Sequence, residues 1–277
     1  MKNLRTSPEF RTLADSIAQL GEQREIFFVP SPGNWGDALI NVGTRQFLDF
    51  FDFNYNEIVR SELLVKLSRS HERDILDALI IVGGGGGWCE TWSSTRSFVH
   101  EISLKVSKVL VLPTTYDLEP IEGTRDNVVY FARDLTVSSS RIAQTTFCHD
   151  MAFFLDFDVP RESVLLPRLV ALRIDKERST QARTFDFSVD MSLLGDAFSS
   201  VIPLFQIINR FERVVTDRLH IAIAGCLLGK DVTLLPGVYP KSQSVYSSSM
   251  YDNYPVSRFL EWRDFEFWPL NELQDSE

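Results

Sequence analysis

The chain has 277 residues, of which 44% are hydrophobic and 24% charged, the composition of a globular protein with one large or two modest domains. Its net charge of −10 argues against a nucleic-acid-binding protein, although local arginines can still hold an anionic substrate. The three cysteines, Cys89, Cys148 and Cys226, lie far apart and predict neither a disulfide framework nor a zinc site. No apolar run reaches membrane-spanning length and the first residues lead into no signal-peptide core, so we expect a cytoplasmic protein.

The first 50 residues predict a helix and then a strand–turn–helix unit. A Ser-Pro-Glu start and a closing glycine delimit the helix at 7–21, and a buried strand follows at 25–29. The next turn, at 30–37, leads into a second helix. Its Gly33, Asn34 and Gly36 let the backbone approach a ligand, and Asp37 either caps the helix or acts as a base. The turn lacks the dinucleotide-binding spacing.

Five consecutive glycines follow the next predicted strand, at 78–82. A turn needs one or two glycines, so this run predicts backbone that lies close to a ligand or to another domain. Trp88 and Cys89 break the dinucleotide-binding pattern here as well. The glycines assigned to the ligand-binding backbone are Gly83, Gly84, Gly85 and Gly86.

The alternation of helix and strand continues to residue 150. A helix is predicted at 95–106, and strands at 108–112, 127–131 and 145–147. The second of these strands delivers Arg133 to the sheet edge that carries the glycine run. The segment Cys-His-Asp at 148–150 has no metal-ligand spacing, so we interpret it as a strand end that leads into a turn.

Prolines and charged residues at 156–167 predict a linker. We therefore divide the chain into an N-terminal domain, residues 1–160, and a C-terminal domain, residues 161–277. A strand at 169–174, a short strand at 185–188 and a helix at 191–209 are predicted next. The aromatic residues of the tail are expected to pack on a core: Phe259, Trp262, Phe265, Phe267 and Trp268.

A strand–helix junction at 213–229 predicts the main binding site. The β-favouring residues 214–216 end at Asp217, a good N-cap, and the helix then runs to Gly229, before a strand at 231–235. Arg218 and His220 therefore stand in the first turn of a helix, past the carboxyl end of a strand. Open α/β sheets bind ligands at this edge, and a helix N-terminus favours an anion. The alternative is a surface arginine beside a capping aspartate.

Several segments together resemble the polysaccharide pyruvyl transferase family, in the family's order. They are Gly-Asn-Trp-Gly-Asp at 33–37, the glycine-rich 81–87, Ala-Arg-Asp at 132–134, Leu-Arg-Ile-Asp-Lys-Glu at 172–177, Val-Thr-Asp-Arg-Leu-His at 215–220 and Tyr-Pro-Lys at 239–241. Two segments depart from the family's pattern. Gly-Trp-Cys-Glu-Thr-Trp at 87–92 stands where many relatives carry Asn-Phe-Gly-Asp, and Pro-Thr-Thr at 113–115 replaces Pro-Gln-Ser. Both departures concern the acceptor more than the donor.

The resemblance implies two Rossmann-like domains that face each other across a cleft, as in GT-B glycosyltransferases. It also implies that the carboxyvinyl unit of phosphoenolpyruvate is transferred onto two hydroxyls of a sugar in polysaccharide biosynthesis, giving a pyruvate ketal and phosphate. The N-terminal domain would hold the acceptor, a lipid- or nucleotide-linked saccharide, and the C-terminal domain the donor. No metal or further cofactor is implied. Peripheral association with membrane polysaccharide machinery is compatible with this function.

The resemblance also assigns roles to individual residues. His220 is the proton donor or relay, with Asp37 as the alternative acid or base. The donor-binding residues are Arg133, Arg173, Arg218, Leu219 and Lys241. Arginines and helix N-termini suit this trianionic donor better than a metal cage. Two rival functions remain open, a GT-B glycosyltransferase that uses a nucleotide sugar and a non-catalytic subunit of a polysaccharide assembly complex.

Overall fold

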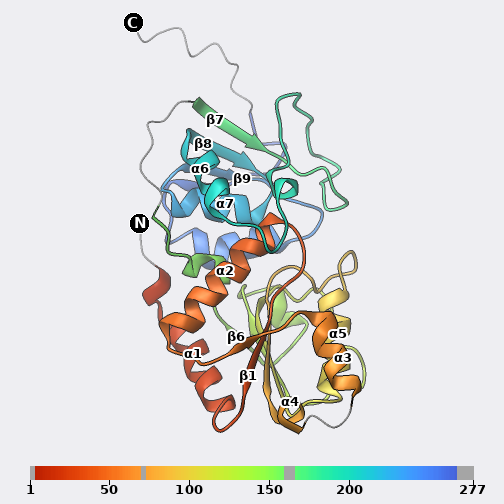
Figure 1. The fold of residues 1–277 in the computed structure, drawn as a ribbon. Helices are drawn as coiled ribbons and strands as arrows, with labels where there is room; N and C mark the ends of the chain where they lie inside the picture. The colour runs from red at the N-terminus through yellow and green to blue at the C-terminus, as the bar shows by residue number, and fades with distance from the viewer. Residues whose placement is uncertain (1–3, 70–72, 159–165, 267–277) are drawn as a thin grey trace, which may run out of the picture.

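The computed structural model describes residues 4–69, 73–158 and 166–266. It confirms a mixed α/β fold with two parallel sheets, which lie in different halves of the molecule (Figure 1). The six-stranded sheet has the order β2-β1-β3-β4-β5-β6, and the four-stranded sheet has the order β10-β9-β8-β7. All the pairings between neighbouring strands are parallel.

The strands are short and mostly buried, as expected for parallel sheets covered on both faces. The six-stranded sheet contains β1 (Ile26–Val29), β2 (Asn56–Glu57), β3 (Leu79–Val82), β4 (Lys108–Thr114), β5 (Val128–Ala132) and β6 (Thr145–Phe147). The four-stranded sheet contains β7 (Leu166–Ala171), β8 (Phe211–Thr216), β9 (Asp231–Leu234) and β10 (Ser257–Phe259). β3 and β9 therefore lie in different sheets, as the predicted division of the chain requires.

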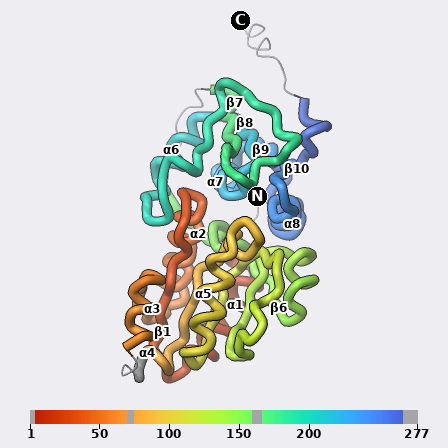
Figure 2. Tube along the Cα trace, turned by 90° about the vertical axis from the view of Figure 1, so that its right-hand side faces the viewer, coloured from red at the N-terminus to blue at the C-terminus, as the bar shows by residue number. Residues whose placement is uncertain are grey.

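Helices pack around both sheets (Figures 1 and 2). They are α1 (Pro8–Leu20), α2 (Trp35–Phe50), α3 (Arg60–Ser68), α4 (Arg73–Asp77), α5 (Ser94–Ser103), α6 (Ile202–Asn209), α7 (Leu219–Leu227) and α8 (Lys241–Val245). The short 3₁₀ turns are η1 (Leu4–Thr6), η2 (Ser138–Ser140), η3 (Met151–Phe154) and η4 (Met191–Leu194), and a π-helical turn, Tyr246–Met250, continues α8.

Helix α2 joins the two halves through a shared hydrophobic core. The largest buried cluster runs from Phe28 and Leu79 of the first sheet, through α2, to Val214 and Leu234 of the second. At the start of α2, the indole Nε1 of Trp35 donates a hydrogen bond to the backbone of the C-terminal half, at Ser200 O (2.9 Å). The N-terminus of α2 is therefore held at the junction of the halves.

The order of the first sheet places a topological switch point between β1 and β3. The chain passes from β1 outward to β2, and then returns to the other side of β1 to form β3. Ligands of open α/β sheets bind outside the carboxyl ends of the strands at such a point. The glycine run after β3 and the turn after β1 both lie there.

Several sequence predictions need correction. Residues 185–188 form no strand, and the helix predicted at 191–209 is the turn η4 followed, after a loop, by α6. The strand predicted at 169–174 starts earlier and ends at Ala171, so the last residues of the predicted linker belong to β7. Gly36 lies inside the first turn of α2 rather than before it, and Asp217 does not cap α7.

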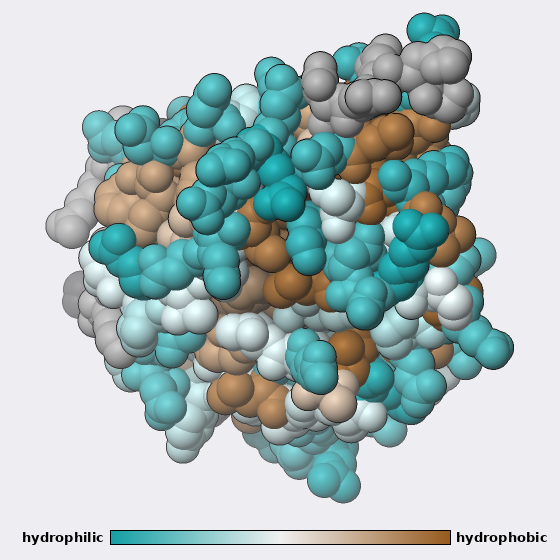
Figure 3. All heavy atoms as spheres, turned by 90° about the horizontal axis from the view of Figure 1, so that it is seen from below, coloured by the Kyte–Doolittle hydropathy of each residue, from teal (hydrophilic) through white to brown (hydrophobic). Residues whose placement is uncertain are grey.

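Other predictions fall partly outside the described residues. The boundary predicted between residues 160 and 161 lies there, as do Phe267 and Trp268. Trp262 and Phe265 are buried against the second sheet, as predicted. Among the described residues, none of the helices has the length and apolar character needed to cross a bilayer. In Figure 3, the face seen from below is mostly hydrophilic, with hydrophobic residues in scattered patches.

Candidate functional site

A cavity of about 370 Å³ lies between the carboxyl ends of the strands of the two sheets. Residues from the N-terminal half that line it are Ser31, Pro32, Gly33, Asn34, Asp37, Gly84, Gly86, Gly87, Trp92, Ser94, Thr95 and Arg133. Residues from the C-terminal half are Arg173, Asp175, Glu177, Ser192, Leu193, Arg218, Leu219, His220 and Lys241. We call these two sets the N-terminal edge and the C-terminal edge of the cavity.

The glycine run packs closely against neighbouring backbone. A Cβ on Gly83 would lie 2.6 Å from Ser31 N, and one on Gly84 would lie 2.3 Å from Pro113 O. Gly85 has φ +122°, which favours glycine. Gly83 and Gly85 do not line the cavity, so much of the run is explained by packing between loops of the first sheet rather than by a ligand.

Gly86 is the glycine at which the two edges meet. A Cβ at this position would lie 3.3 Å from the Tyr239 hydroxyl, 3.4 Å from Arg133 Nη2 and 3.4 Å from Lys241 Nζ. Three hydrogen-bond donors, one from the N-terminal half and two from the C-terminal half, therefore surround one small space above the backbone.

The start of α2 is fixed by a capping box. The Asn34 side chain accepts from Gly36 N (2.8 Å), while Asp37 Oδ2 accepts from Asn34 N (2.9 Å). Gly33 has φ +145°, and a Cβ there would lie 2.0 Å from Asp37 Oδ2, so only glycine fits. Asp37 is thus the partner in a cap, and its other oxygen is available for a second role.

His220 connects this cap to the C-terminal edge. It lies in the first turn of α7, and a Cβ on Gly36 would be 2.6 Å from His220 Nδ1, so α2 and α7 meet at their N-termini. Burial raises the pKa of Asp37, while the charge of His220 opposes that rise. An aspartic acid with a raised pKa beside a histidine can exchange protons with it nearer to neutral pH.

Asp150 supports both His220 and Arg133 from behind the cavity. Its Oδ2 accepts from Arg133 Nη1 (2.6 Å) and lies 3.5 Å from His220 Nε2, which has no hydrogen-bond partner within the described part of the chain. Burial raises the pKa of Asp150, but the stronger combined effect of His220 and Arg133 holds it well below its usual value. Thr115 Oγ1 accepts from Arg133 Nε (2.9 Å) and completes the orientation of the guanidinium.

The assignment of residues 148–150 to a simple turn therefore missed Asp150. The available signal was its place three residues after the end of β6, at the same sheet edge as Arg133. The order of the strands, which brings that edge against α7, could not be obtained from the sequence.

On the C-terminal edge, Arg218 is buried and paired with two carboxylates. Its Nε donates to Asp190 Oδ1 (2.9 Å) and its Nη2 to Asp190 Oδ2, while its Nη1 lies 2.8 Å from Asp175 Oδ2. The positive charge of Arg218 is compensated within the protein. A bound anion would share this arginine with the carboxylates already present.

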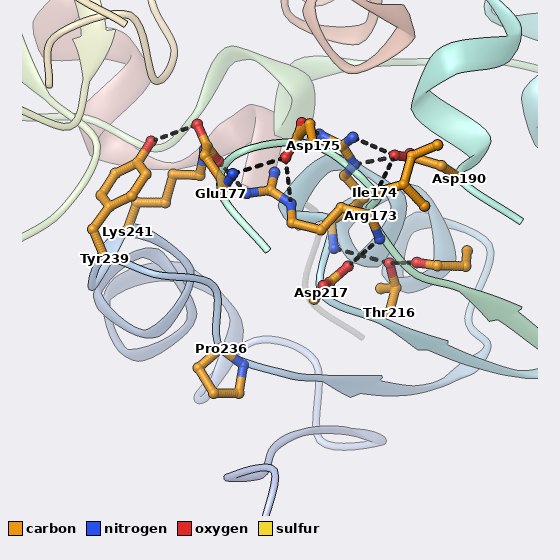
Figure 4. A network of polar contacts seen from close by, with 12 residues as sticks. Arg173, Ile174, Asp175, Glu177, Asp190, Thr216, Asp217, Pro236, Tyr239 and Lys241 are labelled. Carbon is orange, nitrogen blue, oxygen red and sulfur yellow. Dashed lines mark hydrogen bonds and ion pairs between the residues drawn. The ribbon is translucent and has the colours of Figure 1, made fainter. Parts of the chain in front are cut away.

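A second network connects Arg173, Glu177, Tyr239 and Lys241 (Figure 4). Glu177 accepts from Arg173 Nη1, from Lys241 Nζ and, at 3.3 Å, from the Tyr239 hydroxyl. Burial raises the pKa of Glu177, but Lys241 and Arg173 outweigh it and lower the value to about 2. Burial lowers the pKa of Lys241 to about 8, against the opposing charge of Glu177.

Asp217 has a structural role in place of the predicted cap. Its Oδ1 accepts from the backbone N–H of Arg173 (2.8 Å), which ties the loop after β7 to the end of β8. Burial raises the pKa of Asp217 to about 6. Arg218, whose side chain makes no capping hydrogen bond, occupies the N-cap position of α7.

The structure thus brings most of the predicted site residues to one cavity. Those that line it are Gly33, Asn34, Asp37, Gly84, Gly86, Arg133, Arg173, Arg218, Leu219, His220 and Lys241. Three predicted residues do not line the cavity: Gly36, Gly83 and Gly85. Residues to which the sequence gave no role, but which contact or line the site, are Trp92, Asp150, Asp175, Glu177, Asp190 and Tyr239.

No protein-family model matches the chain, and no curated protein matches it. A solved structure of an uncharacterised protein from Klebsiella pneumoniae is similar, with a TM-score of 0.76 and 23% sequence identity over 94% of this chain and 99% of that chain. At this identity the similarity bears on the fold alone. The CDC45 protein of Entamoeba histolytica matches with a TM-score of 0.28 and 9% identity over 44% of this chain and 23% of that chain, too weakly to inform the fold.

Proposed function

We propose that the protein is a polysaccharide pyruvyl transferase, which moves the carboxyvinyl unit of phosphoenolpyruvate onto two hydroxyls of a sugar. The observation that carries the proposal is the convergence of Arg133, Lys241 and Tyr239 at Gly86, in the cavity that also contains His220. The resemblance of the sequence segments to this family supports the same function.

The donors around Gly86 suit a small anion with several oxygens. Arg133 has five N–H groups and uses Nε and Nη1 for Thr115 and Asp150, which leaves Nη2 for a ligand. Lys241 has three N–H groups and donates one of them to Glu177. The phosphate or the carboxylate of phosphoenolpyruvate can accept these remaining donors in charge-assisted hydrogen bonds.

Two helix N-termini add to this attraction. α2 and α7 both begin at the cavity, where the helix dipoles favour negative charge, and the first turn of α7, unlike that of α2, has no side-chain cap on its backbone N–H groups. The protein carries a net charge of −10, so the anion site depends on these local groups and not on the overall field.

The proposed reaction begins with proton transfer to the methylene carbon of phosphoenolpyruvate, which makes C2 electron-poor. The first sugar hydroxyl forms a C–O bond to C2 and releases its proton, which restores the acid. The second hydroxyl then forms the second C–O bond as the bond from C2 to the phosphate oxygen breaks. Phosphate leaves with the proton of the second hydroxyl as hydrogen phosphate, so atoms and charge balance.

His220 is the proposed proton donor. Asp150 Oδ2 lies 3.5 Å from its Nε2, where it favours the protonated ring, and its Nδ1 lies against the α2 cap that contains Asp37. A positioned acid or base of this kind contributes about 10²–10⁴-fold to a rate. Asp37, with its raised pKa, is the proposed relay, which takes the proton of each acceptor hydroxyl and passes the first to His220 and the second to the departing phosphate.

The proposal includes a GT-B-like arrangement, in which the N-terminal half holds the acceptor and the C-terminal half the donor. The position of the cavity, lined by both halves, supports this arrangement. Because Arg133 belongs to the N-terminal half, the donor would contact both halves.

The test is to incubate the protein with phosphoenolpyruvate and a panel of lipid- and nucleotide-linked sugars, and to measure phosphate. We expect phosphate release that requires both phosphoenolpyruvate and one acceptor, with a ketal detected in the product by mass spectrometry. Nucleoside diphosphate release without use of phosphoenolpyruvate would instead identify a glycosyltransferase. Absence of turnover across the panel would favour the non-catalytic subunit.

A further inference from the structure

Two tryptophans of one loop, between the glycine run and α5, have opposite environments. Trp88 is buried, donates from Nε1 to Leu118 O (2.9 Å), and packs edge-on against Tyr116 and Tyr130. Trp92, four residues later, is 45% exposed and lines the cavity. Trp88 therefore holds the loop in the core, while the side chain of Trp92 lies at the cavity.

The surroundings of Trp92 differ from those of the anion site. Trp92 is followed by two hydroxyl residues in the first turn of α5, Ser94 and Thr95, which also line the cavity. Thr95 is held in place because its Oγ1 accepts from Arg60 Nη2 (2.8 Å). In Figure 2, the loop before α5 lies at the top of the lower half, toward the upper half. The ring of Trp92 and the hydroxyl groups of Ser94 and Thr95 thus line the same cavity.

We propose that Trp92 is the stacking surface for a neutral saccharide ring, and that it positions the acceptor next to the anion site. The proposal rests on the proposed function, because it assigns the acceptor of that reaction. A pyranose ring has an apolar C–H face that packs on an indole and hydroxyls at its rim that pair with Ser94 and Thr95. Pockets commonly combine apolar contact with a few polar groups that fix orientation in this way.

The size of the cavity limits the ligand to about one ring beside the anion site. Ligand pockets span about 300–1,000 Å³, and this cavity, at about 370 Å³, is at the small end of that range. Such a volume suits a three-carbon anion with one sugar ring beside it. An aromatic side chain can also stack on a base, so a nucleotide is the alternative that the experiment must separate.

The probes are methyl glycosides of glucose, galactose, mannose and N-acetylglucosamine, with uridine and adenosine as the competing class. Binding is measured by saturation-transfer NMR and titration, without phosphoenolpyruvate, for the wild type and for Trp92→Ala, Trp92→Phe and Tyr251→Ala. Tyr251 is 67% exposed and does not line the cavity, which makes it the matched control. We expect at least one glycoside to bind through its ring C–H protons, with affinity lowered about tenfold or more in Trp92→Ala.

Trp92→Phe should retain most of that affinity, and Tyr251→Ala all of it. The proposal is overturned if no glycoside of the panel binds the wild type, if Trp92→Ala binds glycosides as the wild type does, or if only the nucleosides depend on Trp92. Its failure is distinct from failure of the proposed function. Glycoside binding that requires Trp92, without phosphate release from phosphoenolpyruvate, would retain the sugar site and reject the transfer reaction.

Discussion

The two edges of the cavity are built in different ways. The N-terminal edge is largely backbone, with glycines pressed against neighbouring loops and a helix cap at Asn34. The C-terminal edge consists of buried ion pairs, in which Arg173 and Arg218 are matched by the carboxylates of Asp175, Glu177 and Asp190. The first edge therefore fixes shape, most tightly at Gly84, where an added side chain would meet a backbone atom. The second edge contains buried arginines that are already paired with carboxylates, and these hydrogen bonds can rearrange when an anion binds.

This difference predicts different consequences of mutation. A change at the N-terminal edge should act through sterics, and a change at the C-terminal edge through unpaired buried charge. His220, where the edges meet, should affect the reaction more than it affects binding or folding.

The largest expected effect is on turnover, in His220→Ala and His220→Gln. Both variants should lose about 10²-fold or more in kcat, with nearly normal affinity for phosphoenolpyruvate, because the proton donor is removed while the anion site remains. Measurement of kcat and of donor affinity by titration separates the two. Normal turnover in His220→Gln would show that the histidine only makes hydrogen bonds and would move the acid role to Asp37.

The second effect is on stability. Arg218→Ala should lower the free energy of unfolding by about 3–5 kcal/mol, because Asp190 is left charged and buried. The double variant with Asp190→Asn should lose less than the single variant. The control is Arg213→Ala, since the exposed ion pairs of Arg213 at 3.7 and 4.0 Å should contribute about 0–1 kcal/mol. Equal losses in the single and double variants, measured by urea unfolding, would contradict the charge-pair account.

The third effect compares two glycines of the N-terminal edge. Gly84→Ala should lower the free energy of unfolding by about 1–3 kcal/mol, because its Cβ would lie 2.3 Å from Pro113 O, a backbone atom. Gly86→Ala meets only the ends of flexible side chains, so its stability should stay within about 0.5 kcal/mol of the wild type. Its donor affinity should fall, since the methyl group fills the space between Arg133 and Lys241. If Gly86→Ala is destabilised but binds the donor normally, Gly86 serves packing and not the donor site.

The smallest effect is a dependence of donor affinity on pH. The pKa of Lys241 is lowered to about 8, so its positive charge is present below this pH and is lost above it. Affinity for phosphoenolpyruvate should therefore fall by up to about tenfold from pH 7 to pH 9. Lys241→Arg, which stays charged, should flatten this part of the profile. A wild-type affinity that is unchanged over this range would remove Lys241 from the anion site.

The sequence predicted the parts of the fold that depend on local patterns. Short apolar runs such as residues 26–29 and 79–82 have the length and composition of buried strands, and the Ser-Pro-Glu start and the closing glycine delimited α1. The helix predicted at 191–209 failed because apolar residues are spaced through the whole segment. In the folded chain, Gly195 packs on Trp35 and Asp196 pairs with Asn34, so tertiary contacts interrupt the helix.

The candidate site was predicted only in part, for a related reason. Arg133 could be found because it directly follows β5, and Arg218 and His220 because they lie at the start of the helix that follows β8. Asp150 and Asp190 act through residues 17 and 28 positions away, at Arg133 and Arg218, and no local pattern reports such pairs. At Asp217 a local pattern gave a wrong prediction. This residue type favours an N-cap, but here its carboxylate accepts from the backbone N–H of Arg173.

Both edges are expected to contribute to one anion site, and titration of phosphoenolpyruvate measures the contribution of each. Isothermal calorimetry would compare the wild type with Arg133→Gln from the N-terminal edge, Lys241→Gln from the C-terminal edge, and Arg213→Gln as the control. The account predicts that the wild type binds, that each edge variant binds about ten- to a hundredfold more weakly, and that the control is unchanged. Absence of binding to the wild type, or normal binding to either edge variant, would contradict it.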